Sequence, residues 1–208
     1  MKITTAIFDL DGTLLNTLGD LCDSVNCAVL RRGFPAVTEE QTRLRVGHGI
    51  RRLIEQCIPE NKRTEAMLDN CLDDFRTAYS ERMMNRTQPY DGILPLLKAL
   101  KKAGIAVGVL SNKYDVAAKN LIRHYFGDLV QVTCGERPDT PRKPDPTSTL
   151  RLLRELGGDA TTTLYIGDSA VDMQTAKNAG LTAVGVTWGF RPAEELKAAG
   201  ADARPFEC

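Results

Sequence analysis

Apolar segments and amphipathic segments alternate along the second half of the chain, and this alternation constrains the fold more than any other feature. After residue 89 the short apolar runs predict strands, and the segments between them have the spacing of helices. The strands are expected at residues 105–110, 129–133, 163–166 and 182–186, and the helices at residues 93–102, 116–124, 146–156 and 170–178. Continuously apolar strands that alternate with helices are typical of a parallel sheet covered on both faces. The sequence therefore predicts an α/β fold.

One further strand is expected far from the others in the sequence. Residues 3–8 form a β-rich run, and Gly12 marks a turn soon after it. The residues from about 15 to 86 have helical spacing throughout. We therefore expect a doubly wound core with a parallel sheet, made of residues 1–14 and 87–208, and an all-helical domain of residues 15–86 inserted after the first strand.

Charge and composition exclude several classes of function. Lys plus Arg and Asp plus Glu both number 27, so the formal net charge is zero and no long-range field attracts nucleic acid or an anionic membrane. The apolar runs are much shorter than the ~18 residues of a membrane span, and the N-terminus lacks the apolar region of a secretory signal. We expect a cytoplasmic monomer or homodimer that binds neither nucleic acid nor membrane.

The cysteines are expected to be reduced thiols without a metal, because they show no metal-ligand spacing and a chain of this size needs no disulfides. They are Cys22, Cys27, Cys57, Cys71, Cys134 and Cys208.

Polar motifs follow the predicted strands. In doubly wound sheets ligands bind beyond the carboxyl ends of the strands, so these motifs are expected to meet. The motifs are Asp9-Leu10-Asp11-Gly12-Thr13, Ser111-Asn112-Lys113, Arg142-Lys143-Pro144-Asp145-Pro146 and Gly167-Asp168-Ser169-Ala170-Val171-Asp172. Carboxylates a few ångströms apart repel one another, so a cluster of four is favourable only around a cation. Ligands that are all oxygen favour Mg²⁺ over zinc.

The four motifs, in this order, resemble those of the haloacid dehalogenase superfamily of phosphotransferases, and the resemblance covers essentially the whole chain. The helical insertion resembles the cap of that family as it is found in phosphoglycolate phosphatases, and residues 186–191 resemble the same subgroup. The resemblance implies a Rossmann-like core, a helical cap, and Mg²⁺-dependent hydrolysis of a small phosphorylated metabolite, with 2-phosphoglycolate as the first substrate to consider.

The resemblance also implies catalytic roles. Asp9 would be the nucleophile that forms an aspartyl-phosphate, and Asp11 would be the general acid and base. Ser111 would bind a phosphoryl oxygen, and Lys143 would offset the charge of the transferring group. Lys113 competes for the cationic role, but the family motif places its lysine before a proline, as at Lys143.

The implied metal ligands are the Asp9 side chain, the Asp11 backbone carbonyl and the Asp168 side chain. Asp172 would either support these ligands from behind or act as an alternative ligand. Its other interpretation is a carboxylate that stabilises the first turn of a helix.

Substrate binding is expected from both domains. Thr13 and Asn112 are the core candidates beside the catalytic motifs. In the insertion, glycines flank His48 and would allow close approach of a ligand. Arg45, His48 or Arg51 would bind a carboxylate at the far end of the substrate; alternatively, this segment is a break between helices with solvated arginines.

Two local features of the insertion are a capping motif and an unusual residue near its start. Thr38 and Gln41 match a capping box at the start of a helix. Asn16 stands where many caps of this type begin with Asp, a departure that concerns the hinge of the cap more than the chemistry.

Two other functions remain open. A phosphomutase similar to β-phosphoglucomutase would share all four motifs, and a phosphate-binding protein without activity would share the fold. A dehalogenase is disfavoured because Asp11 is present, and nucleotide-binding enzymes are disfavoured because the chain has neither GxxxxGK[ST] nor GxGxxG after the first strand.

Overall fold

The computed structural model describes residues 2–202, so Cys208 and the predicted end of the core lie outside the described residues. The chain divides into two compact units. We call Met1–Asn16 with Pro89–Cys208 the core unit, and Thr17–Gln88 the inserted unit. The expected division into two domains at residues 15 and 86 stays a prediction.

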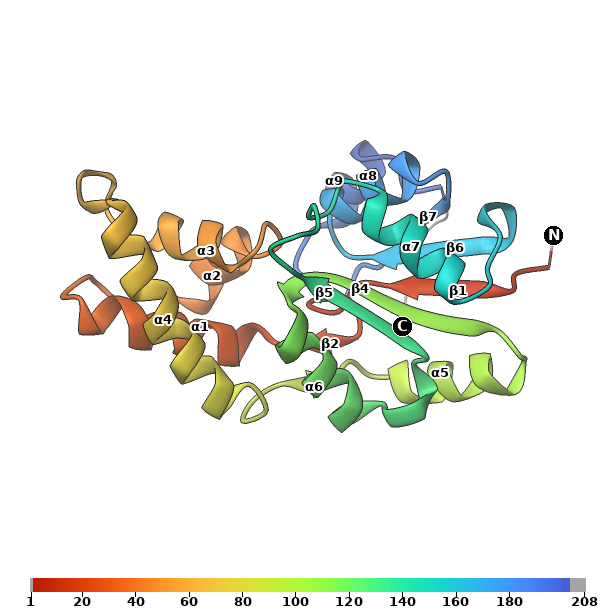
Figure 1. Ribbon diagram of the computed structural model, residues 1–208, viewed down its shortest axis with the longest axis horizontal. Coiled ribbons are helices and arrows are strands. Elements are labelled where there is room, and N and C mark those ends of the chain that lie inside the picture. The colour runs from red at the N-terminus through yellow and green to blue at the C-terminus, as the bar shows by residue number, and fades with distance from the viewer. Residues whose placement is uncertain (1, 203–208) are drawn as a thin grey trace. The chain divides into compact units, whose positions relative to one another are not determined.

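The core unit contains a sheet of five parallel strands in the order β5-β4-β1-β6-β7 (Figure 1). The strands are β1 (Thr5–Phe8), β4 (Ala106–Tyr114), β5 (Val132–Glu136), β6 (Thr163–Gly167) and β7 (Thr182–Gly185). The first strand of the chain lies in the middle of the sheet, and all of its residues are buried. The chain builds outward from β1 in both directions, which confirms the predicted doubly wound α/β fold.

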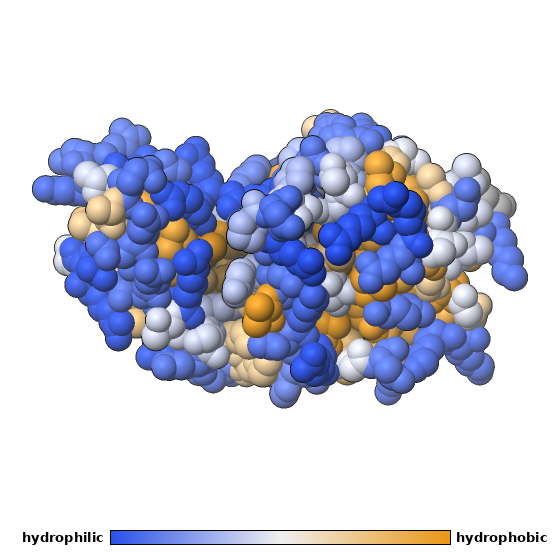
Figure 2. Space-filling model, in the orientation of Figure 1, coloured by the Kyte–Doolittle hydropathy of each residue, from blue (hydrophilic) through white to orange (hydrophobic). Residues whose placement is uncertain are grey.

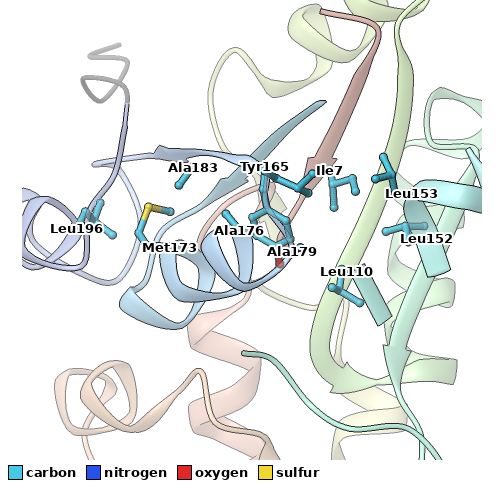
Figure 3. Packing of buried hydrophobic residues seen from close by; sticks show 11 residues of the cluster. Ile7, Leu110, Leu152, Leu153, Tyr165, Met173, Ala176, Ala179, Ala183 and Leu196 are labelled. Atoms are coloured by element: carbon cyan, nitrogen blue, oxygen red, sulfur yellow. The ribbon is translucent and has the colours of Figure 1, made fainter. Parts of the chain in front are cut away.

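Helices cover both faces of this sheet. In Figure 1, α5 and α6 lie on one face, and α7, α8 and α9 lie on the other. The helices are α5 (Ile93–Lys102), α6 (Asp115–Tyr125), α7 (Thr147–Glu155), α8 (Ala170–Asn178) and α9 (Ala193–Ala198), with 3₁₀ turns η2 (Gly127–Leu129) and η3 (Ala160–Thr162). Figure 3 shows the core between them, where Ile7, Tyr165, Leu152, Met173 and Leu196 are fully buried. Burial of these side chains is the main favourable term that holds the layers together.

Strand β4 is longer than the sequence predicts. The apolar run ends at Leu110, but the strand continues to Tyr114, which pairs with Glu136 after a shift of register. Gly135 allows this approach, because a Cβ atom there would lie 2.6 Å from the carbonyl oxygen of Lys113. The polar motif after Leu110 is therefore held by a strand and not by a free loop.

The inserted unit is helical, with a core between its helices. Its elements are α1 (Leu18–Arg31), α2 (Glu39–Arg45), α3 (Ile50–Cys57), the 3₁₀ turn η1 (Glu60–Lys62) and α4 (Glu65–Arg82). Helices α1 and α4 make the most extensive contact, and the rings of Phe75 and Tyr79 stack at 5.3 Å within α4. The predicted capping box of α2 is confirmed: Gln41 N donates to Thr38 Oγ1 at 3.1 Å, and Thr38 N donates to Gln41 Oε1 at 2.9 Å.

The last residues of the inserted unit are bound to its first helix. Asp20 of α1 is almost completely buried, and its carboxylate accepts from Arg86 N at 3.0 Å, Thr87 N at 2.9 Å and Thr87 Oγ1 at 2.7 Å. The short strands β2 (Leu15–Asn16) and β3 (Gln88–Pro89) form a two-stranded sheet where the chain passes between the units.

Hydrophilic residues cover much of the face drawn in Figure 2, with smaller apolar areas between them. The large apolar side chains that are exposed include Leu30 and Leu44 in the inserted unit and Tyr114 and Val116 in the core unit. No helix among the described residues is both long enough and apolar enough to cross a membrane. The cysteines of the described part are free.

Candidate active site

Three buried carboxylates meet at the carboxyl end of the sheet. Asp9 directly follows β1 and Asp168 directly follows β6, and these neighbouring strand ends are tied by a hydrogen bond from Asp9 N to Ile166 O at 2.8 Å. Asp172 lies in the first turn of α8. One carboxylate oxygen from each of the three aspartates lies within 4.8 Å of the others. This buried acidic triad could hold a metal ion.

Lys143 lies between two of these carboxylates. Its Nζ atom is 2.7 Å from Asp9 Oδ1 and 2.7 Å from Asp172 Oδ1. The contact with Asp9 is an ion pair. It lacks the geometry of a hydrogen bond, and Asp9 Oδ1 has no hydrogen-bond partner among the described residues. The backbone of Lys143 is held by the Asn112 side chain, which accepts from Lys143 N at 2.9 Å and donates to Lys143 O at 3.3 Å. Asn112, expected to bind substrate, therefore already binds Lys143.

Burial controls the ionisation of this cluster. Burial raises the pKa of Asp9 well above its usual range, the charges of Asp172 and Asp168 add to this, and Lys143 opposes it. Burial also raises the pKa of Asp168 to about 7, with Asp172 contributing. Burial alone would lower the pKa of Lys143, but Asp172 and Asp9 outweigh it and hold that pKa well above the usual value. One lysine among three carboxylates leaves an excess of negative charge that a cation would relieve, so the residues fit a bound metal ion.

The oxygens of Asp172 are already bound within the site. Oδ1 accepts from Lys143 Nζ, and Oδ2 accepts from Ser169 Oγ at 2.5 Å and Ser169 N at 3.1 Å. Ser169 and Asp172 together form the capping box of α8. Asp172 thus both stabilises the first turn of α8 and holds Lys143, and its role toward a metal, as a support of the ligands or as an alternative ligand, stays a prediction.

Asp168 is oriented by residues from two other loops. Its Oδ1 atom accepts from Thr13 Oγ1 at 3.3 Å, and its Oδ2 atom accepts from Phe190 N at 2.7 Å. Gly12 has a φ of 85°, and a Cβ atom there would lie only 2.2 Å from Asp168 Oδ2. A glycine is therefore required at this turn, both for its backbone conformation and for space. Thr13, expected to bind substrate, is directed at Asp168.

Asp11 and Lys113 form a second ion pair in the site. Lys113 Nζ lies 2.9 Å from Asp11 Oδ1, with both side chains largely buried. The structure thus places Lys143, and not Lys113, beside Asp9. Ser111 is buried and its Oγ atom accepts from Lys113 N at 3.2 Å, which leaves its hydroxyl hydrogen for another acceptor.

A small, partly open pocket lies against Ser111 and Lys143 within the core unit. Arg137 and Arg142 also line it. Arg142 is ion-paired with Glu136, so an anionic group entering from this side would have to compete with that pair.

The three candidates in the inserted unit have different surroundings. Arg45 Nη1 lies 3.4 Å from Cys57 Sγ, and His48 is exposed. Arg51 pairs with Asp69 at 2.8 Å and also with Glu65, both on α4. A substrate carboxylate could bind Arg51 only by displacing Asp69 and Glu65 from it. The substrate roles of Arg45, His48 and Arg51 stay predictions.

A segment outside the four polar motifs lies against Asp168. Trp188, Gly189 and Phe190 were noted only as part of the resemblance, and Tyr90, whose ring centroid lies 6.5 Å from that of Trp188, was not noted at all. A signal was available, since this segment follows the carboxyl end of β7, just as the predicted site loops follow their own strands.

Comparisons with known proteins agree with this geometry. The family described as haloacid dehalogenase-like hydrolase matches residues 6–186. A phosphoglycolate phosphatase from Agrobacterium fabrum (strain C58) is 36% identical over 192 residues, covering 89% of this chain and 81% of that protein. One from Mesorhizobium japonicum is 35% identical over 192 residues, covering 88% of this chain and 82% of that protein.

A solved structure from Lactobacillus delbrueckii subsp. bulgaricus superimposes with a TM-score of 0.91 at 31% identity, covering 98% of this chain and 94% of that chain. The chain belongs to the haloacid dehalogenase-like hydrolase family. Within that family it is an enzyme of the phosphatase class.

Proposed function

We propose that the protein is a Mg²⁺-dependent phosphatase that hydrolyses a small phosphorylated metabolite, with 2-phosphoglycolate as the first candidate, through a phosphorylated Asp9. The observation that carries the proposal is the buried Asp9 carboxylate beside both Lys143 and the Asp168 carboxylate. Asp9, Lys143 and Asp168 thus place a nucleophilic oxygen, a positive charge and a candidate metal site within a few ångströms of one another.

The chain's own residues supply most of the chemistry in this proposal. Asp9 attacks phosphorus, and the new Asp9–phosphorus bond forms as the bond to the leaving oxygen breaks. Lys143 offsets charge on the transferring group, and the Ser111 hydroxyl donates to a phosphoryl oxygen. Asp11 gives a proton to the leaving oxygen and then accepts one from the water that releases phosphate.

Mg²⁺ would be held by the Asp9 and Asp168 carboxylates with the Asp11 carbonyl, and it would offset phosphate charge as a Lewis acid. The Asp172 carboxylate keeps Lys143 in place, as its 2.7 Å contact indicates. Asn112 fixes the backbone of the same lysine. The site therefore contains both attacking and supporting groups.

The choice of 2-phosphoglycolate rests on the relatives. Phosphoglycolate phosphatases of Agrobacterium fabrum and Mesorhizobium japonicum are 36% and 35% identical to this chain over 192 aligned residues. In this proposal the inserted unit acts as a cap that selects the substrate, and Arg45 or His48 binds the carboxylate of the substrate. Arg51 is the weaker candidate because Asp69 and Glu65 already bind it.

The test is phosphate release by the purified full chain, with Mg²⁺ or with EDTA, from 2-phosphoglycolate, sugar phosphates, nucleotides and an aryl phosphate. The proposal expects release that requires Mg²⁺ and is fastest for 2-phosphoglycolate. Undiminished release in EDTA would contradict the metal requirement, and a faster sugar phosphate would replace the substrate. Isomerisation of a sugar phosphate that depends on a bisphosphate activator would identify a phosphomutase instead.

A further inference from the structure

We propose that Trp188, Gly189 and Phe190, which we call the strap, position Asp168 and the Thr13 loop for metal binding. The inference rests on the proposed function, because it assigns the strap to the metal site of that reaction. The strap follows β7 at the same edge of the sheet as the site loops. None of its side chains would touch the metal, so these are positioning residues.

Phe190 fixes one oxygen of Asp168. The backbone N–H of Phe190 donates to Asp168 Oδ2 at 2.7 Å, and the Phe190 side chain is buried. A hydrogen bond from a backbone group to a carboxylate is short and directional. The orientation of Asp168 therefore depends on the path of the backbone at residue 190.

Gly189 allows the strap to lie directly on the site. A Cβ atom at this position would be 2.3 Å from Asp168 Cβ and 2.4 Å from Gly12 O. Real Cβ atoms essentially never approach other atoms so closely, and neither neighbour is the end of a flexible side chain. Any side chain at residue 189 would therefore displace the strap, Asp168 or the Gly12 turn.

Trp188 anchors the strap to the loop on the other side of Asp168. Its indole Nε1–H donates to Thr13 O at 3.0 Å, and its ring lies against Tyr90. Thr13 Oγ1 in turn donates to Asp168 Oδ1 at 3.3 Å. Three hydrogen bonds and the backbone of the strap thus form a closed ring of contacts through Trp188, Thr13, Asp168 and Phe190, which we call the circuit. Both carboxylate oxygens of Asp168 accept hydrogen bonds within it.

Groups behind a metal ligand commonly change metal affinity by ~10-fold to 100-fold when they are mutated. The circuit predicts that Gly189→Ala weakens Mg²⁺ binding by at least about 10-fold, and that Trp188→Phe, which removes the indole N–H but keeps an aromatic ring, weakens it several-fold. Because the chemical groups remain, phosphate release by both variants should recover at high Mg²⁺.

The experiment measures the Kd for Mg²⁺ by calorimetric titration of the full chain and, separately, phosphate release as a function of Mg²⁺ concentration. The control is Leu196→Ala, which opens a cavity in α9 at a fully buried residue outside the circuit. It should lower the melting temperature and leave the Kd for Mg²⁺ unchanged. The strap variants should raise that Kd beyond any change in the control.

The outcomes separate two kinds of failure. If the unmodified chain bound no Mg²⁺, the proposed function would fail. If the unmodified chain bound Mg²⁺ and Trp188→Phe bound it equally well, the proposed role of the strap would be overturned. Equal loss of affinity in Leu196→Ala would also overturn it, since general destabilisation would explain the effect. If Gly189→Ala did not fold, Trp188→Phe would decide alone.

Discussion

Asp9 and Asp168 are buried carboxylates that the proposed reaction requires in the ionised form. Burial raises the pKa of both, and for Asp168 it does so to about 7. Lys143 is the one ammonium group within ion-pairing distance of Asp9 among the described residues, and it is shared with Asp172. A divalent cation would supply the missing positive charge, and ionisation and metal binding should therefore be linked.

The raised pKa of Asp168 has a definite consequence for stability. Its usual pKa is about 4, so without metal the folded state binds this proton more tightly than the unfolded state. The contribution is zero below about pH 4 and destabilises the fold progressively as the pH rises from about 4 to about 7. In the proposed function Mg²⁺ would bind the ionised form, so its stabilising effect should grow over the same window.

The measurement is the change in melting temperature produced by Mg²⁺ at about pH 5, 6, 7 and 8. We expect a small change at about pH 5 and a larger change at about pH 7 and pH 8. Asp168→Asn is the matched variant, and it should show little response to Mg²⁺ at any pH. An equal response at all pH values in the unmodified chain would contradict the linkage.

Among the elements, α8 begins with a capping box that also belongs to the site. Ser169 Oγ accepts from Asp172 N and donates to Asp172 Oδ2, whereas Asp172 Oδ1 accepts from Lys143. Helix α2 has the same kind of box, made by Thr38 and Gln41, in the inserted unit. Comparing α8 with α2 therefore separates the effect of a capping box on stability from its effect on the position of Asp172 and Lys143.

Ser169→Ala should lower the free energy of unfolding by about 1 kcal/mol, as loss of an N-cap usually does. It should also slow phosphate release by roughly 10-fold or more, because Asp172 and then Lys143 lose their alignment. Thr38→Ala should cost about as much stability without this loss of activity. Urea denaturation and steady-state kinetics of both variants check the prediction, and equal activities would show that the α8 cap is structural only.

Most regular elements were predictable from the sequence, but the strand expected at residues 129–133 is displaced: Gly127–Leu129 form a 3₁₀ turn and β5 spans Val132–Glu136. The irregular features depend on contacts between distant residues. Apolar strands and helical spacing are local properties, so the strand that includes Phe8 and the helix that begins at Ala170 appear where the sequence predicts them. The extension of β4 to Tyr114 depends on β5, where Gly135 allows the strands to approach. No pattern within residues 106–114 carries that information.

At the scale of the whole molecule, the sequence also predicted which loops converge. The carboxyl ends of parallel strands share one edge of the sheet. The proximity of Asp9 and Asp168, which the structure shows, was therefore predictable from the sequence. The sequence could not predict that Arg51 pairs with α4, because the partners, Asp69 and Glu65, lie on another helix. It could not predict the contact of Trp188 with Thr13 either, since the two residues are 175 positions apart.

Asp20 links the first helix of the inserted unit to the last residues of that unit. Asp20 is buried and accepts hydrogen bonds from the backbone of Arg86 and from Thr87. Asp20→Ala would leave these donors without their acceptor, so the free energy of unfolding should fall by about 2–3 kcal/mol. Asp23→Ala removes only a half-exposed ion pair with Arg86 and should cost less than about 1 kcal/mol.

Urea denaturation of the two variants provides the comparison. Equal, small losses of stability would show that the buried carboxylate does not hold the two ends of the inserted unit together.

The central claim is that Asp9 becomes phosphorylated during turnover. The most direct measurement is mass spectrometry of peptides from enzyme quenched in acid during Mg²⁺-dependent turnover of 2-phosphoglycolate, with Asp9→Asn as the control. We predict that the peptide with Asp9 gains the mass of one phosphoryl group, and that the variant gains none and releases phosphate more than about 10³-fold more slowly. Rapid phosphate release by the variant, with no phosphorylated Asp9 in the unmodified enzyme, would contradict the account.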